Sequence, residues 1–302
     1  MTRFLHFRFG LILLFLLAGI AGLACAKTVA ANASAISEYV RPVNEAGEPR
    51  PEGYVFAEGQ FFEGSSVDRG IERTAFADLT RVLASSLAKQ NYFPSPEVDS
   101  AQLIIMVHWG TTTVYEDPNE IETAANLHSA AAAYQEAYAA NGGMADTSAL
   151  NAALMNAEMD SQLRAGTEAR NAALLGYRSA LAKESRNIMM SSVEMGMRFE
   201  LAEERYFVIL MAYDNVARMK EHKSKLLWVT RLSIRSLGND FTEALGKLAN
   251  VGSQVFGKQV DDLLRVTPGE NIGSVTLGEL KVLGIADDPP PEQKETEPKR
   301  KE

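Results

Sequence analysis

The sequence predicts an α+β fold, in which a mixed or antiparallel sheet carries packed helices and an alanine-rich helical insertion. Three observations indicate this class. Residues 103–109 and 206–213 are apolar at consecutive positions, as is typical of strands buried on both faces. Other segments repeat apolar residues at the spacing of a helix. Residues 121–183 contain 20 alanines in 63 positions and no proline, a composition that favours helix.

The first half of the predicted domain reads as strand, helix, strand. Residues 54–59 form the first strand, and residues 69–90 form a helix. The apolar stripe of that helix consists of Phe76, Leu79, Val82, Leu83 and Leu87. Because residues 103–109 show no polar face, we expect this strand to lie in the middle of the sheet.

The second half reads as a long antiparallel hairpin followed by a helix. Residues 206–213 form one strand, and residues 225–235 alternate, with Trp228 and Leu232 on one face and Arg231 on the other. Asp240 then begins a helix, with Glu243 placed to complete a capping box. A short final strand at 275–283 is expected to close one edge of the sheet.

Residues 117–204 are predicted to be a helical insertion within an α+β domain that spans 54–285. The start and the breaks of three or four helices are indicated by Asp117-Pro118 with Glu120, by Gly142-Gly143, by Gly166-Thr167 and by Ser191 with Glu194. Alanine buries little area, so such helices are weakly held unless they pack against something else. The sequence leaves open whether they dock on the sheet or project from it.

Residues 1–26 have the pattern of a secretory signal peptide. Arg3 and Arg8 precede an apolar run at 9–23, and small residues follow it. The run is shorter than the roughly 20 residues that a membrane span needs. We therefore expect the protein to be exported, either free in the periplasm or anchored to the outer membrane.

The single cysteine, Cys25, lies at the expected cleavage point and has two interpretations. It is either the middle residue of an A-x-A site cleaved after Ala26, or the last residue of a permissive lipobox at 21–25. In the second case Cys25 is the site of lipid attachment and becomes the first residue of a lipoprotein. In both cases residues 27–53 are expected to act as a tether or linker, and the proline-opened, charged residues 286–302 are expected to be disordered.

Composition excludes some functions. With 39 acidic and 30 basic side chains the net charge is −9, which argues against nucleic-acid binding. Hydrolase, phosphate-loop, dinucleotide and zinc motifs do not occur, and the four histidines are widely separated. We therefore predict no cofactor, no metal site and no catalytic residue.

Two weak candidate binding sites stand out. One is the end of the strand at 103–109, where His108 and Trp109 are followed by Gly110 and Thr111; the alternative is a histidine that is hydrogen-bonded within the core or at the rim of the sheet. The other is a basic loop that would meet an anionic partner or lipid headgroups, or would simply be solvated. Its residues are Arg218, Lys220, Lys223 and Lys225, with His222 among them.

Methionine is concentrated in the insertion, where seven of the eleven fall between Met144 and Met197. Methionine adapts to irregular surfaces and recurs on binding faces, but it also fills gaps in cores. Both interpretations stay open at this point.

The two halves of the sheet domain resemble a layout found in exported bacterial lipoproteins of unknown function. The resemblance is carried by Tyr92-Phe93 and Ser100-Ala101-Gln102-Leu103, then by the strand at 206–213, Leu226-Leu227-Trp228 and the helix at Asp240. It covers residues 54–112 and 206–257, and the insertion departs from it. The resemblance implies a location in the cell envelope and no established activity. We expect an exported, non-enzymatic protein that uses the insertion for contact with an envelope partner or with itself; the alternative is a small-ligand binder or enzyme at His108 and Trp109.

Overall fold

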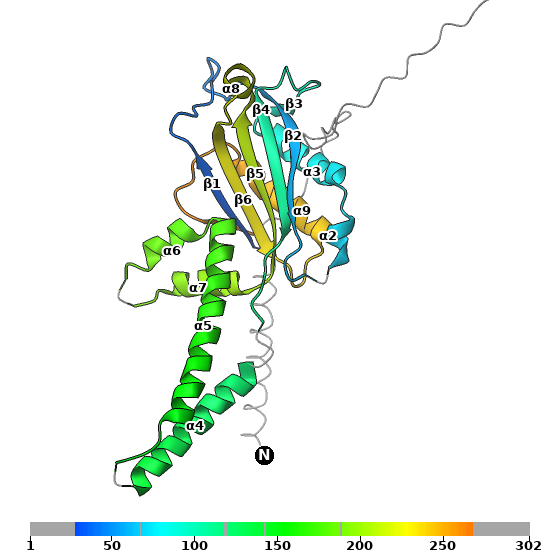
Figure 1. The fold of residues 1–302 in the computed structure, drawn as a ribbon. Helices are drawn as coiled ribbons and strands as arrows, with labels where there is room; N and C mark the ends of the chain where they lie inside the picture. The colour runs from blue at the N-terminus through cyan, green and yellow to red at the C-terminus, as the bar shows by residue number, and fades with distance from the viewer. Residues whose placement is uncertain (1–27, 67, 117–119, 142, 188, 268–302) are drawn as a thin grey trace, which may run out of the picture.

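The computed structural model describes residues 28–66, 68–116, 120–141, 143–187 and 189–267. They form a seven-stranded mixed sheet with helices on both faces (Figure 1), which confirms the α+β prediction. Strand β2 pairs in parallel with β3 and β4, and the other neighbours are antiparallel. The order across the sheet is β3 (Tyr92–Pro94), β2 (Glu52–Phe62), β4 (Leu103–Thr111), β5 (Arg205–Asp214), β6 (Leu226–Arg235), β1 (Val29–Ala35) and β7 (Leu264–Val266).

The two faces of the sheet are covered differently. One face, here called the core face, packs against α2 (Arg69–Arg73), α3 (Phe76–Ala88) and α9 (Phe241–Val255). The opposite face, here called the insert face, is covered over part of its area, chiefly by helices of the insertion. Strand β4 lies inside the sheet as predicted, but only its core-face residues are fully buried, so its burial alternates along Leu103–Val107.

The helix predicted at 69–90 is divided into α2 and α3. Thr74 and Ala75 adopt extended backbone conformations between them. This break allows Ile71 to be buried in the core while Phe76 contacts Trp109, with ring centroids 5.4 Å apart. Tertiary packing of two apolar side chains thus overrides a continuous helical pattern.

The predicted hairpin and the helix after it are confirmed. Strands β5 and β6 pair antiparallel, and the short helix α8 (Asn215–Glu221) connects them. Trp228 and Leu232 are buried on the core face, as the alternation of β6 predicted. Asp240 caps α9 by accepting the backbone N–H groups of Thr242 and Glu243. The Glu243 carboxylate pairs with Lys247 at 2.8 Å.

The prediction that residues 27–53 form a tether is wrong. Residues Val29–Ala35 form β1, which pairs with β6 over its whole length and with β7 on its other side. Alanine has a low preference for strands, so the sequence of β1 carries no clear signal. The strand forms because β6 supplies a complete ladder and because small residues fit closely beneath α9.

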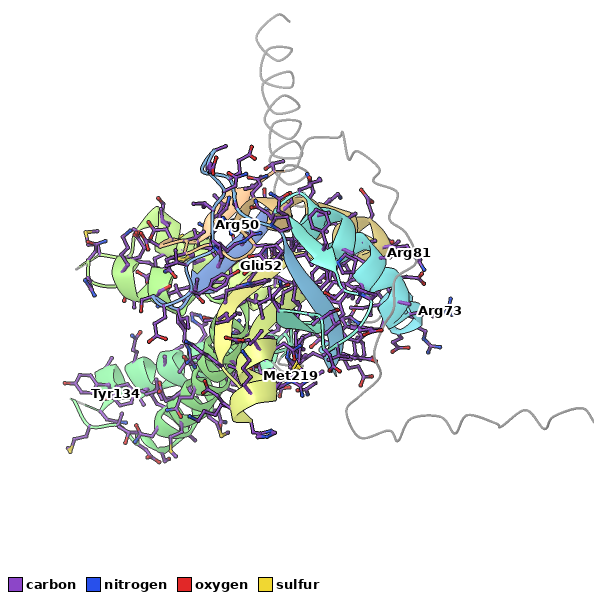
Figure 2. The ribbon with its side chains drawn as sticks, turned by 90° about the horizontal axis from the view of Figure 1, so that it is seen from above. Arg50, Glu52, Arg73, Arg81, Tyr134 and Met219 are labelled. Atoms are coloured by element: carbon purple, nitrogen blue, oxygen red, sulfur yellow. The ribbon has the colours of Figure 1, made fainter. Side chains whose placement is uncertain are left out.

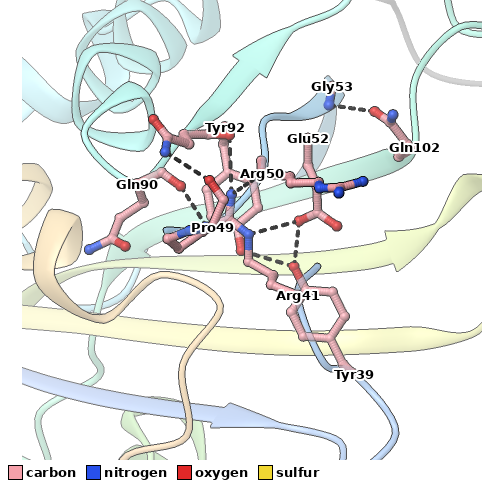
Figure 3. Close-up of polar contacts among 10 residues, drawn as sticks. Tyr39, Arg41, Pro49, Arg50, Glu52, Gly53, Gln90, Tyr92 and Gln102 are labelled. Carbon is pink, nitrogen blue, oxygen red and sulfur yellow. Dashed lines mark hydrogen bonds and ion pairs between the residues drawn. The ribbon is translucent and has the colours of Figure 1, made fainter. Parts of the chain in front are cut away.

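The loop after β1 is also held against the sheet, by Arg41 (Figure 3). Its guanidinium donates to the carbonyls of Gln90 and Arg50, pairs with Glu52 at 3.2 Å, and lies 4.0 Å from the ring centroid of Tyr92. Tyr39 donates its hydroxyl proton to Glu52 and lies 2.9 Å from the Tyr92 hydroxyl. Burial raises the pKa of Tyr92 to about 12.

The described part of the insertion forms helices and no strand, as predicted: α4 (Glu120–Ala140), α5 (Ser148–Leu175), α6 (Arg178–Glu184) and α7 (Ser192–Ala202). Ser191 caps α7 by accepting the N–H of Glu194. The predicted break at Gly166 is wrong, because α5 continues to Leu175 and ends at Gly176 in the left-handed conformation. One glycine among strong helix formers costs only about 1 kcal/mol, which does not end a helix.

Several predictions concern residues outside the described part of the chain. They are the signal peptide, the lipid-attachment role of Cys25, the N-cap at Asp117, the strand at 275–283 and the tail at 286–302. Within the described part, the sheet ends instead at β7, beside β1. None of the described helices combines the length and the apolar character needed to cross a bilayer.

Candidate interaction surface

The insertion has two parts that differ in how they are held. The helical arm, defined here as α4 together with residues 141–166, extends away from the sheet (Figure 1). Seen from above, Tyr134 on the arm and Arg81 on α3 lie on different sides of the sheet (Figure 2). Among the arm residues whose exposure is described, none is buried. The arm therefore has no core of its own.

The rest of the insertion, from residue 167 to 204, is here called the base, and it docks on the insert face. Asn171 is buried, and its side-chain amide donates to the carbonyls of Thr113 and Leu201 at 2.9 and 3.0 Å. Tyr177 is also buried and donates to Glu200 at 2.6 Å. The apolar cluster beneath the base is formed by Ala30, Ala172, Leu175, Tyr177, Met197, Leu201, Phe207, Ile209 and Val229. The sequence left open whether the insertion docks on the sheet or projects from it. The structure shows that the base docks and that the arm projects.

Exposure separates the two interpretations of the methionines. Met197 is 1% exposed and packs at the base, as the gap-filling interpretation requires. The other six are exposed, including Met155 at 72% and Met159 at 60%. Gap filling in a core therefore accounts for one of the seven methionines.

Three exposed apolar side chains of α5 share one side of the helix. Met155, Met159 and Leu163 are spaced by four residues, so each lies about 40° around the helix from the one before. We call these three residues the methionine stripe. The arm, residues 120–166, has six acidic and one basic side chain, a net charge of −5. Its charges are thus few and almost all of one sign.

The predicted strand-end site is not formed. His108 and Trp109 are consecutive in β4 and point to opposite faces of the sheet. Trp109 is buried in the core between Phe61 and Phe76. The Thr111 hydroxyl donates to the carbonyl of Glu63. The three side chains therefore do not converge on one ligand.

His108 has a structural role on the insert face. Its Nδ1 accepts the backbone N–H of Gln60 at 2.8 Å, where β2 bulges. Burial lowers the pKa of His108, which favours the neutral ring that this bond requires. This matches the alternative of an ordinary structural histidine.

The predicted basic loop is a helix and a turn, and two of its four cations, Lys223 and Lys225, pair with carboxylates. Arg218 donates to the side chain of Asn215, Lys223 lies 3.7 Å from Glu221, and Lys225 lies 2.8 Å from Glu38. Lys220 forms no ion pair within the described residues. The same part of the chain contains no group of three or more His, Cys, Asp or Glu arranged to hold a metal ion.

Comparisons with known proteins add little to this geometry. No family model matches the chain, and no curated protein matches it. One solved structure that is similar, with a TM-score of 0.36 and 9% identity, is a PDZ domain protein from Parabacteroides distasonis. The match covers 82% of this chain and 40% of that protein.

Proposed function

We propose that this protein is an exported, non-enzymatic component of the bacterial cell envelope, and that its helical arm is a docking surface for another protein chain. The observation that carries the proposal is the methionine stripe on an arm without a core. An arm that stabilises the fold would bury its apolar side chains, whereas this one leaves Met155 and Met159 in solvent. The pattern at residues 1–26 supports export.

The physical basis for docking is burial of the stripe. Each methionine that passes from solvent into an interface contributes about 1.5–3 kcal/mol. Unbranched methionine side chains also adapt to a partner whose shape is not strictly complementary. Because the arm carries a charge of −5, the partner surface should be apolar with a neutral or basic rim.

The proposal is tested by substituting two methionines of the stripe with glutamate. The double variant Met155→Glu and Met159→Glu should weaken association by at least about 100-fold, since two methionines lose their burial. The matched control, Ser161→Glu with Ala165→Glu, adds the same charge at two exposed positions of α5 that lie about 160° and 120° around the helix from the middle of the stripe, and should leave association unchanged.

The readout distinguishes the two kinds of partner. Sedimentation of the full chain over a range of concentrations detects self-association, and crosslinking in the native host detects a different envelope protein. In either case the stripe variant should lose the signal and the control should keep it. An oligomer and a crosslinking pattern that are the same in all three proteins would refute the proposal.

The mode of anchoring is tested by the intact mass of the protein recovered from its host. A diacylated chain that begins at Cys25 identifies a lipoprotein, and an unmodified chain that begins at Lys27 identifies a free exported protein. If lipidated, β1 begins only a few residues from the lipid, because residues 27–53 are not a free tether. The sheet itself would then lie close to the membrane surface.

A further inference from the structure

A polar cavity lies on the insert face, away from the helical arm. Its volume is about 450 Å³, and its walls come from β1, β6, the turn between α5 and α6, and the loop after α9. A cavity of this size is in the range that holds small ligands. The polar side chains that line it are Asn32, Ser34, Arg178, Ser179, Arg231 and Gln259, with Asp261 as the one acidic group.

Arg231 is the unusual member of this set. It lies within β6, directly opposite Asn32 of β1, and it is half-buried. Among the described residues, its only hydrogen bond is a long one of 3.4 Å from Nη1 to Oδ1 of Asn32. No carboxylate of the described residues lies within 4.0 Å of its guanidinium nitrogens. A guanidinium in partial burial without a counter-ion is unfavourable, and burial accordingly lowers the pKa of Arg231.

The other arginines of strands β5, β6 and β7 have hydrogen-bond acceptors or carboxylates beside them within the protein. Arg265 of β7 pairs with Glu200 at 2.9 Å, and Arg235 of β6 pairs with Glu203 at 3.1 Å. Arg205 of β5 is buried, and it donates to the hydroxyl and the carbonyl of Ser233. Arg231 therefore differs from these three arginines in that its one acceptor among the described residues is the long contact with Asn32.

A second arginine reaches the same cavity. Arg178, the first residue of α6, lines the cavity and forms no ion pair among the described residues. It is brought there by the turn at Gly176, which has φ +82° and approaches β1 so closely that a Cβ would overlap the Asn32 side chain. The cavity thus contains two unpaired cations and one carboxylate.

We propose that this cavity binds a small molecule through a carboxylate or phosphate group held against the Arg231 guanidinium. A planar guanidinium presents paired donors that match the oxygens of either group. Arg178 adds charge from the exposed side, and Gln259 adds an amide donor, since its Oε1 is already bonded to the N–H of Ala35. The site is independent of the proposed docking by the arm.

Ligand-dependent stabilisation of the full chain tests this site. Thermal unfolding is followed while inorganic phosphate or acetate replaces chloride at constant ionic strength. We expect saturable stabilisation by at least one of the two anions, and the anion that is effective identifies the preferred group. Arg231→Gln should weaken the apparent affinity by at least about tenfold, because a charge-assisted hydrogen bond is lost.

Two further variants control the experiment. Arg178→Gln, at an exposed position, should weaken binding by a few-fold and keeps the test decisive if Arg231→Gln does not fold. Arg81→Gln removes the same charge from α3, on the core-face side, and should bind as the wild type does. The inference is overturned if neither anion stabilises the wild type saturably, or if the anion stabilises wild type, Arg178→Gln and Arg81→Gln equally.

Discussion

The core face of the sheet and the helical arm use apolar residues in opposite ways. Leu248 of α9 is completely buried on the core face, together with Trp228 and Phe241. Met155 and Met159 of α5 are apolar as well, yet they remain in solvent. Both regions are helical, but α9 is amphipathic and covers a face of the sheet, whereas α4 and α5 have little amphipathic character. The comparison indicates that the core face specifies the fold and that the arm is available for contacts outside it.

The largest expected effect comes from the core face. Leu248→Ala removes a fully buried side chain from beneath α9 and should lower the free energy of unfolding by about 2–5 kcal/mol. Met159→Ala on the arm should change it by less than about 0.5 kcal/mol. Urea denaturation of both variants measures the difference. Equal losses would show that the stripe is buried within the folded monomer, contrary to the comparison.

An intermediate effect is expected where the arm joins its base. Asn171→Ala leaves the carbonyls of Thr113 and Leu201 without their donor, and should cost about 1–3 kcal/mol. Hydrogen exchange should become faster in α5 and α7, while the strands of the sheet keep their protection. Asn156→Ala, an exposed change on the same helix, is the matched control. Unchanged exchange in Asn171→Ala would mean that the base is held by its apolar cluster alone.

The smallest effect is a dependence of stability on pH at His108. Its pKa is lowered in the folded state, so the unfolded chain binds a proton more readily. The stabilisation by neutral His108 is therefore complete above the unfolded pKa of about 6.5 and is lost as the pH falls from there towards the folded pKa. His108→Gln should flatten this part of the stability profile, and His128→Gln, on the exposed arm, should not. Parallel profiles for wild type and His108→Gln would contradict the role assigned to this ring.

Much of the fold could be predicted because its signals are local. Strands β4, β5 and β6 carry unbroken or alternating apolar runs, and Asp240 and Ser191 mark helix starts by their capping chemistry. Strand β1 could not be predicted, because its sequence of one valine, four alanines, an asparagine and a serine has no strong preference for strand without a partner. The break between α2 and α3 was missed for a related reason, since it depends on where Ile71 and Phe76 find the core.

The candidate surfaces, too, were predictable only where their signals are local in sequence. The sequence marked the insertion as unusual by its alanine and methionine content, but exposure alone separated Met197 from Met155. The alternation of β6 placed Arg231 on the face opposite Trp228, yet no pattern could show that its neighbours lack a carboxylate. His108 and Trp109 are adjacent in sequence and predicted a shared site, but consecutive side chains of a strand point to opposite faces of the sheet.

By itself, then, the sequence determined the α+β class, the positions of the principal strands and helices, and the presence of a helical insertion. Each of these follows from periodicity and capping, which act between residues close along the chain. Only the tertiary structure decided that residues 29–35 complete the sheet, that the insertion docks by its base and projects its arm, and that Arg231 faces a cavity. These outcomes depend on partners distant in sequence, and the free energy of burying a side chain or leaving a charge unpaired is set by those partners.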